Sequence, residues 1–222
     1  GAVYRIDPQG NNSSNGKYGI PGDNPFVGND KDWMPEIYAH GFRNPHRITW
    51  TKGGEMLVSN IGQGQIESLY MLRAGDDYGW PVREGTFKLK PEDDSNMVFP
   101  LPENEASFGF TYPVAMYDHD EGNAISGGYE YTGTEVPGLN GKYLFGDITR
   151  GRLFYVNIAD LEIGKQAPIY EWTVEYEGVS IPLEKLAGSR RVDLRFGKDA
   201  SGEMYLFTKA DGKVYKMASV KN

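Results

Sequence analysis

Gly54-Glu55-Met56-Leu57-Val58 follows the short run Ile48-Thr49-Trp50 across the turn Lys52-Gly53-Gly54. β-branched and aromatic residues favour strands, and two such runs around a glycine turn are typical of a β-hairpin. The same frame returns as Gly141-Lys142-Tyr143-Leu144-Phe145 and as Gly202-Glu203-Met204-Tyr205-Leu206, each after a strand and a turn. Residues 2–6, 152–156 and 213–217 also have strand character. The pattern predicts an all-β protein.

The three hairpin frames recur at irregular spacing, with loops of different length between them. A strand–turn–strand unit that repeats with variable loops indicates the blades of a β-propeller. A β-sandwich is the alternative on the pattern alone, because its strands also recur at short spacing. We expect residues 1–222 to form a single β-propeller domain or part of one.

The composition agrees with a β-rich globular chain. Its 222 residues suffice for one domain or two small ones, and 29 Gly with 13 Pro argue against a helix bundle. Three segments outside the repeat carry separate predictions. Residues 88–105 are predicted to be a long surface loop, residues 171–176 an edge strand, and residues 181–187 a short helix.

Charge and residue usage exclude several classes of function. The net charge is −8 and no basic cluster is visible, which argues against a nucleic-acid partner. The absence of Cys excludes disulfides, zinc–thiolate sites and cysteine nucleophiles. No apolar run approaches the length of a membrane span, so none is predicted. Three His residues are too few to favour a multi-histidine metal site.

The loop Gly41-Phe42-Arg43-Asn44-Pro45 places an Arg and an Asn side by side before a strand. Pro45 disfavours helix at Asn44, so the pair lies in an extended or turn conformation. A guanidinium and an amide in such a loop can face one planar, anionic ligand. The alternative is a solvent-exposed Arg beside a turn Asn.

Two later segments combine glycines with acidic side chains. In Ser59–Glu67 the glycines expose backbone carbonyls directly after a strand, and carbonyl and carboxylate oxygens suit Ca²⁺. In Asp76–Gly85, two aromatic residues stand beside acids. Glu67, a carbonyl near Tyr78 and Glu84 are predicted to converge on a Ca²⁺ ion. The alternative is a set of turn acids that hydrogen-bond the backbone.

Six motifs in this order resemble the soluble quinoprotein sugar dehydrogenases, the glucose/sorbosone dehydrogenase family. They are Arg43-Asn44-Pro45, Ile61-Gly62-Gln63 with Glu67, Tyr78-Gly79-Trp80-Pro81, Gly127–Tyr131, Tyr143–Asp147 with Gly151-Arg152, and Arg195–Asp199 with Gly202-Glu203. The resemblance covers residues 2–217. It implies a six-bladed β-propeller that binds pyrroloquinoline quinone (PQQ) and Ca²⁺ and oxidises a sugar hydroxyl by hydride transfer.

The resemblance also implies roles for individual residues. Arg43 and Asn44 correspond to a cofactor-contacting pair, and Gly62 and Gln63 to residues whose carbonyls hold the Ca²⁺ bound to the cofactor. Glu67 and the Tyr78 carbonyl resemble ligands of a structural Ca²⁺. Arg191 or Arg195 corresponds to an arginine that reaches the PQQ carboxylates. Thr149 stands where the family has a quinone-contacting lysine, and Arg150 is the candidate substitute.

The chain corresponds only to the later half of the family's propeller, so roughly half of the blades are expected. The family's catalytic histidine lies in the earlier half, and His40, His46 and His119 do not match it. No catalytic residue is therefore predicted here. His119 and Trp80 are predicted on the substrate side.

Half a ring would expose faces that normally pack on other blades. The chain is accordingly expected to be a fragment, to pair with a missing half or with itself, or to be a non-catalytic relative that binds sugars or proteins. A calcium-dependent lactonase is a weaker alternative, by analogy of fold alone. The family implies a sugar substrate, an external electron acceptor and a periplasmic or secreted location.

Overall fold

The computed structural model describes residues 1–90 and 96–219, and most of its regular structure is β-strand. Three antiparallel sheets form the body, and in each the strand order follows the chain order. The first sheet contains β3 (Asn44–Trp50), β4 (Met56–Ile61), β5 (Ile66–Leu72) and β9 (Ala115–Asp118). The second contains β10 (Ile125–Glu130), β11 (Lys142–Asp147), β12 (Leu153–Asn157) and β13 (Tyr170–Trp172). The third contains β16 (Leu194–Lys198), β17 (Met204–Thr208) and β18 (Lys213–Lys216).

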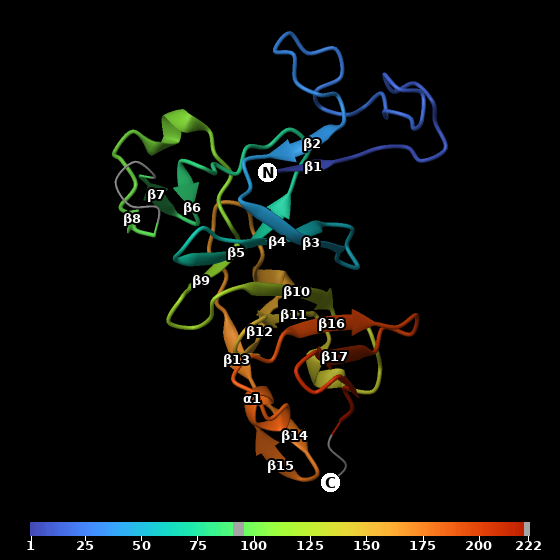
Figure 1. Ribbon diagram of the computed structural model, residues 1–222, viewed down its shortest axis with the longest axis vertical. Coiled ribbons are helices and arrows are strands. Elements are labelled where there is room, and N and C mark those ends of the chain that lie inside the picture. Colours follow the sequence, from blue (N-terminus) through green and yellow to red (C-terminus); the bar gives the residue numbers. More distant parts are fainter. Residues whose placement is uncertain (91–95, 220–222) are drawn as a thin grey trace.

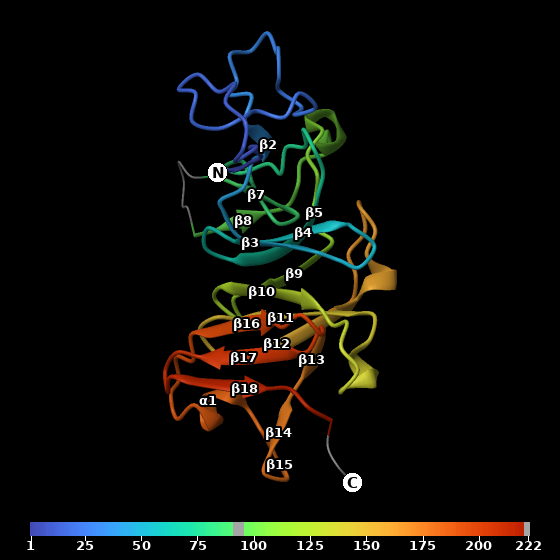
Figure 2. The ribbon, with the colours of Figure 1, turned by 90° about the vertical axis from the view of Figure 1, so that its right-hand side faces the viewer.

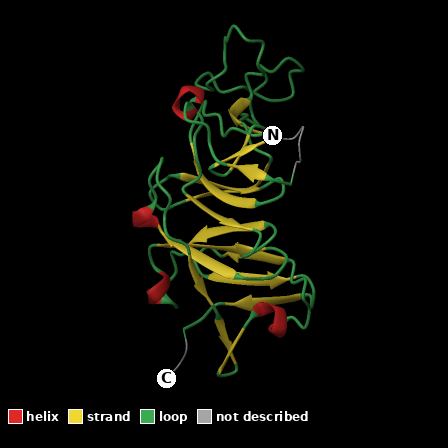
Figure 3. Cartoon of the chain, turned by 90° about the vertical axis from the view of Figure 1, so that its left-hand side faces the viewer, coloured by secondary structure: helices red, strands yellow, loops and turns green. Residues whose placement is uncertain are grey.

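Smaller elements surround these sheets. Three small sheets are formed by β1 (Ala2–Tyr4) with β2 (Ile37–His40), by β6 (Arg83–Glu84) with β7 (Phe87–Leu89) and β8 (Val98–Phe99), and by β14 (Val174–Tyr176) with β15 (Val179–Ile181). The helical elements are α1 (Leu183–Leu186) and the 3₁₀ turns η1 (Glu105–Phe108), η2 (Pro137–Leu139) and η3 (Ile158–Asp160). All of them are short and lie at the periphery (Figure 3). No helix in the described part of the chain is long and apolar enough to cross a membrane.

The sheets are stacked, with β10 of the second sheet packed against β3 of the first and β16 of the third (Figures 1 and 2). Successive side chains of a strand point to opposite faces. On β11, Tyr143 and Phe145 therefore enter the core shared with the first sheet, while Leu144 enters the core shared with the third. The second sheet is therefore packed on both faces, because it lies between the other two sheets.

The structure confirms the three predicted hairpins and the all-β class. Trp50 pairs with Met56, Glu130 with Tyr143, and Lys198 with Met204. A stack of three meandering sheets also differs from the two-sheet sandwich that the pattern left open. The first strands of these sheets, β3, β10 and β16, will be called the inner strands.

Two of the three predictions outside the repeat needed correction. Residues 88–105 do not form one continuous loop, because β7 and β8 pair within this range; residues 91–95 lie outside the described part. The predicted strand 171–176 is two strands, β13 and β14, that belong to different sheets. The predicted helix 181–187 is confirmed as the single turn α1.

Candidate functional site

The loop before β3 is held tightly against the segment that follows β5. Gly41 has φ +79°, and a Cβ there would lie 2.0 Å from Asp77 Oδ1 and 2.6 Å from the Tyr78 amide. The Trp80 amide donates to the Gly41 carbonyl at 2.8 Å. Glycine is required here because both the conformation and the close approach exclude a side chain. The predicted site residues Arg43 and Trp80 thus come from adjoining segments.

Arg43 and Asn44 lie where β3 begins, beside the end of β4. Arg43 is exposed, and its Nε lies 3.5 Å from Gln63 Oε1. The backbone amide of Asn44 donates to Oδ1 of the buried Asn60 at 2.9 Å. The Asn44 side chain itself is exposed. The structure therefore brings Arg43, Asn44 and Gln63 together on one rim.

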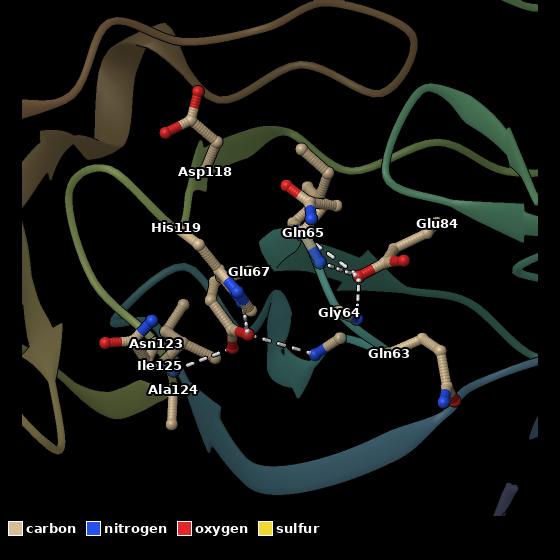
Figure 4. A network of polar contacts seen from close by, with 12 residues as sticks. Gln63, Gly64, Gln65, Glu67, Glu84, Asp118, His119, Asn123, Ala124 and Ile125 are labelled. Atoms are coloured by element: carbon tan, nitrogen blue, oxygen red, sulfur yellow. Dashed lines mark hydrogen bonds and ion pairs between the residues drawn. The ribbon is translucent and has the colours of Figure 1, made fainter. Parts of the chain in front are cut away.

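The loop between β4 and β5 is organised around Glu84 (Figure 4). Glu84 Oε1 accepts hydrogen bonds from the amides of Gly64, Gln65 and Ile66 at 2.9 to 3.0 Å. A Cβ on Gly62 would lie 1.9 Å from the Ile66 carbonyl and 2.5 Å from Glu84 Oε1, so the loop closes only around glycine. Glu84 Oε2 is buried without a hydrogen-bond partner. A buried carboxylate oxygen with no donor is an open position for a cation.

Glu67 lies on the other side of the same loop and is fully buried (Figure 4). Its Oε1 accepts from the Gly62 amide at 3.3 Å and contacts His119 Nε2 at 3.2 Å, while its Oε2 accepts from the Ile125 amide at 2.8 Å. Burial raises the pKa of the Glu67 carboxyl, and these hydrogen bonds oppose the rise. Both carboxylate oxygens of Glu67 have partners, whereas Oε2 of Glu84 has none.

Tyr78 does not share these contacts. Its ring stacks on Phe42 at 4.3 Å in a separate apolar cluster, and its hydroxyl donates to the Met71 carbonyl at 3.0 Å. Among the described residues, no group of three or more His, Cys, Asp or Glu side chains is arranged to hold a metal. A Ca²⁺ ion here would therefore depend on backbone carbonyls besides Glu67 or Glu84.

The three predicted arginines of the later segments lie in different surroundings. Arg150 donates to the carbonyls of Asp120 at 2.6 Å and His119 at 3.1 Å, which ties it to the Glu67–His119 contact. Arg191 pairs with Asp193 at 3.1 Å, and its side chain is 70% exposed. Arg195 lies on the inner strand β16 and donates to the Leu194 carbonyl at 2.7 Å. Arg195 is half-buried, whereas Arg191 is exposed.

His46 was not among the predicted site residues, and the structure adds it. It lies on the inner strand β3, and its Nδ1 is buried without a partner. Burial lowers its pKa, and the charges of Arg195 and Arg47 lower it further. Both β3 and β16 pack against β10. Only its place directly after Arg43-Asn44-Pro45 could have indicated His46 in the sequence.

A line of cationic side chains follows the inner strands. Arg47 Nη1 donates to the Tyr129 hydroxyl at 2.8 Å, and Lys198 Nζ lies 5.6 Å from the centre of the same ring. Arg43 directly precedes β3, and Arg195 lies three residues before Lys198 on β16, so four cations lie on or next to these two strands in a chain of net charge −8. Such a concentration of positive charge favours an anionic ligand.

These features describe a stack of β-meanders with cationic side chains along the inner strands and a glycine-rich loop that carries buried carboxylates. The family model described as glucose / sorbosone dehydrogenase matches residues 1–216. The chain belongs to this family.

Individual relatives match over shorter stretches. The HIPL2 protein of Arabidopsis thaliana is 34% identical over 142 residues, which cover 60% of this chain and 19% of that protein. Quinoprotein glucose dehydrogenase B of Acinetobacter calcoaceticus is 29% identical over 99 residues, 45% of this chain and 17% of that protein. The chain therefore matches about a fifth of the length of these relatives.

Solved structures share the fold over nearly the whole chain. A crystal structure of a glucose dehydrogenase superposes with a TM-score of 0.67 at 22% identity, covering 99% of this chain and 55% of that one. The PQQ-bound aldose sugar dehydrogenase from Streptomyces coelicolor superposes with a TM-score of 0.53 at 22% identity, covering 90% and 46%. The chain spans about half the length of these structures.

Proposed function

We propose that this chain is part of a PQQ-dependent sugar dehydrogenase, in which it supplies cofactor- and calcium-binding residues. When bound, PQQ would accept the hydride removed from a sugar hydroxyl, and an external acceptor would then reoxidise it. The proposal rests on family membership together with the cationic inner side. PQQ is a planar tricarboxylate, and the cations of the inner strands fit its charge.

The residues of the rim would bind and orient the cofactor. Arg43 and Arg195 would pair with carboxylate or quinone oxygens, since a guanidinium offers a planar fork of donors. Asn44 would add a neutral hydrogen bond. The buried, unpartnered Nδ1 of His46 supports a ligand at this place, because an unsatisfied buried polar atom is costly unless a partner arrives. Arg150 and Arg191 are also proposed to contact the cofactor; in the structure Arg150 donates to two backbone carbonyls and Arg191 pairs with Asp193.

Calcium would bind beside the loop of residues 62–66. Gly62 and Gln63 are proposed to offer carbonyls to the Ca²⁺ that accompanies the cofactor. Glu84 Oε2 is the open oxygen for a second, structural Ca²⁺ ion, with Glu67 and the Tyr78 carbonyl as the other proposed ligands. His119 and Trp80 remain proposals for the substrate side. His119 would act there while its Nε2 is held by Glu67.

We further propose that the three stacked sheets are about half of a six-bladed propeller. The share of the solved dehydrogenase structures that the chain spans supports this proportion. The catalytic base would lie in the other half, so the chain alone is expected to show no dehydrogenase activity. A missing half or a second copy would complete the ring, and we propose a periplasmic or secreted location, as the resemblance to the family implies.

A titration with PQQ in the presence of Ca²⁺ tests the proposal, with absorbance, melting temperature and light-scattering mass measured on the same sample. We expect saturable binding and a raised melting temperature for the wild-type chain, and a loss of both for Arg43→Ala. Arg5→Ala is the matched control, because Arg5 pairs with Asp23 on the surface near β1. Equal binding by Arg43→Ala, or none by a well-folded chain with or without a completing half, would refute the assignment.

A further inference from the structure

The two residues of β6, Arg83 and Glu84, are both charged and both only 4% exposed. Charged side chains are almost never buried to this extent unless they are paired. Glu84 binds the amides of residues 64–66 (Figure 4), whereas Arg83 contacts the segment that begins with η1. Successive side chains of a strand point to opposite faces, so the two contacts lie on opposite sides of β6. Whatever holds Arg83 therefore also fixes the place of Glu84.

Arg83 is held by an ion pair with Glu105. Its Nε donates to Glu105 Oε1 at 3.0 Å, and its Nη2 donates to Glu105 Oε2. Such a two-bond pair is strong and also fixes the orientation of both groups. Arg83 Nη1 donates to the Val82 carbonyl at 2.8 Å, and the Tyr112 hydroxyl donates to the Glu105 carboxylate. Each nitrogen at the end of the Arg83 side chain thus has an acceptor.

Two phenylalanine rings contact the same guanidinium. The central carbon of the Arg83 guanidinium lies 4.9 Å from the centre of the Phe108 ring and 5.3 Å from that of the Phe110 ring. A cation over an aromatic ring is attracted to it. Removal of Glu105 would leave the Arg83 charge buried without a counter-charge, which is strongly unfavourable.

The backbone on both sides of β6 leaves little room for movement. The Arg83 amide donates to the Gly79 carbonyl at 2.8 Å, and a Cβ on Gly79 would lie 2.9 Å from Arg83 Cβ. After Glu84, a Cβ on Gly85 would lie 2.6 Å from the Ile66 side chain. Residues 83–85 are therefore packed tightly between the Arg83–Glu105 pair and the loop of residues 62–66.

We propose that Arg83 and Glu105 are positioning residues, which hold the Glu84 carboxylate in place against the loop of residues 62–66. One oxygen of Glu84 organises three amides of this loop, and the other is open to a cation. Residues behind a metal ligand orient it and thereby raise the affinity for the metal. The part of this inference that concerns calcium rests on the proposed function; the positioning of Glu84 does not.

Hydrogen exchange of the calcium-free chain tests the positioning. Glu105→Ala should speed the exchange of the Gly64, Gln65 and Ile66 amides at least about tenfold, because their common acceptor is released. Glu105→Gln keeps an acceptor oxygen for Arg83 and should speed it less than about threefold. The Ile125 amide is the internal reference, because it donates to Glu67 and not to Glu84.

Glu171→Ala is the matched control. Glu171 forms the same kind of two-bond pair with Arg152, whose guanidinium lies 5.2 Å from the Phe154 ring, but this pair belongs to the second sheet. The control should leave the exchange of the loop amides unchanged. No acceleration at residues 64–66 in Glu105→Ala, or equal acceleration at Ile125, overturns the positioning role.

A milder variant keeps the test open if Glu105→Ala does not fold. Tyr112→Phe removes one donor to the Glu105 carboxylate. It should speed the exchange of the same three loop amides by a smaller factor and leave Ile125 unchanged. Unchanged exchange at residues 64–66 in this variant overturns the proposal.

Calorimetric titration with Ca²⁺ separates this inference from the proposed function. We expect the Ca²⁺ affinity to fall about 10- to 100-fold in Glu105→Ala and to stay unchanged in Glu171→Ala. An unchanged affinity in Glu105→Ala would overturn the role of the pair in calcium binding. If the wild-type chain binds no Ca²⁺, the calcium assignment fails, and the exchange rates of residues 64–66 still decide whether Arg83 and Glu105 position Glu84.

Discussion

His119 Nε2 lies 3.2 Å from Glu67 Oε1, and the two residues are 52 positions apart in the chain. Glu67 belongs to β5 of the first sheet, and its second oxygen accepts from Ile125, the first residue of β10 in the second sheet. One buried carboxylate therefore joins two neighbouring sheets and the loop between them. This role in the fold holds whether or not Glu67 also binds a metal.

Glu67→Gln should destabilise the protein. The side-chain amide of Gln has one oxygen that can accept, and its NH₂ group replaces the other oxygen of Glu67. This NH₂ group must then face either the Ile125 amide or the pair formed by the Gly62 amide and His119. A buried donor left without a partner costs about 1–3 kcal/mol of unfolding free energy. Urea denaturation measures this. His119→Gln, at the half-buried end of the contact, should cost less than about 1 kcal/mol; equal costs would contradict the central role of Glu67.

Glu84→Ala should loosen the loop of residues 62–66, because three amides lose their common acceptor. Glu84→Gln keeps one carbonyl oxygen in that place and should preserve the loop. Hydrogen exchange of the Gly64, Gln65 and Ile66 amides is the direct measurement. We expect faster exchange in the Ala variant alone. If Glu84 Oε2 is a calcium ligand, both variants should lose the Ca²⁺-dependent rise in melting temperature.

Gly62→Ala should cost about 3 kcal/mol, since its methyl group would overlap the Ile66 carbonyl and Glu84. Gly138→Ala is the control, because a Cβ at Gly138 meets no atom within 4 Å. We expect the control to stay within about 0.5 kcal/mol of wild type. Thermal unfolding of both variants checks this pair. A mild Gly62→Ala variant would show that the loop is not closed around this residue.

His46 should make stability depend on pH. Its pKa is lowered in the folded protein below the ordinary value of 6.5. Below pH 6.5 the His46 imidazole therefore binds a proton more readily in the unfolded chain than in the folded protein. The free energy of unfolding falls as the pH is lowered from 6.5 to the pKa of His46 in the folded protein. His46→Gln should remove this part of the pH dependence. Unfolding free energies measured from pH 7.5 to pH 5 test it, and an unchanged slope in the variant would assign the effect elsewhere.

Arg195→Ala should weaken PQQ binding much more than Arg191→Ala. Arg195 is half-buried on an inner strand, whereas Arg191 is 70% exposed and already paired with Asp193. We expect the affinity for PQQ to fall at least about tenfold in Arg195→Ala and less than about threefold in Arg191→Ala, because central contacts usually contribute more to binding than peripheral ones. The reverse order would identify Arg191 as the family arginine.

Local patterns of the sequence were sufficient for the hairpins. β3 with β4, β10 with β11 and β16 with β17 join runs of β-forming residues across short or turn-rich connections, and the strand period is visible in each. The motif Arg43-Asn44-Pro45 predicts an Arg and an Asn that can face a ligand, and both side chains are exposed where β3 begins. The order of six motifs was enough to identify the family, which the match over residues 1–216 confirms.

Contacts between distant segments could not be predicted in this way. That Glu67 meets His119, that Glu84 caps the loop of residues 64–66, and that Arg195 lies close enough to lower the pKa of His46 all depend on how the sheets stack. The predicted strand 171–176 failed for the same reason, because hydrogen-bonding partners from other segments divide it between two sheets.

The sequence by itself determined the strand class, the hairpins and the family, because these follow from residue type and from spacing over a few positions. The tertiary structure alone decided which acid has a buried oxygen without a partner, which arginine is half-buried, and which tryptophan stays exposed. Those properties depend on side chains that pack and hydrogen-bond across the sheets, and the chain brings them together only when the stack is complete.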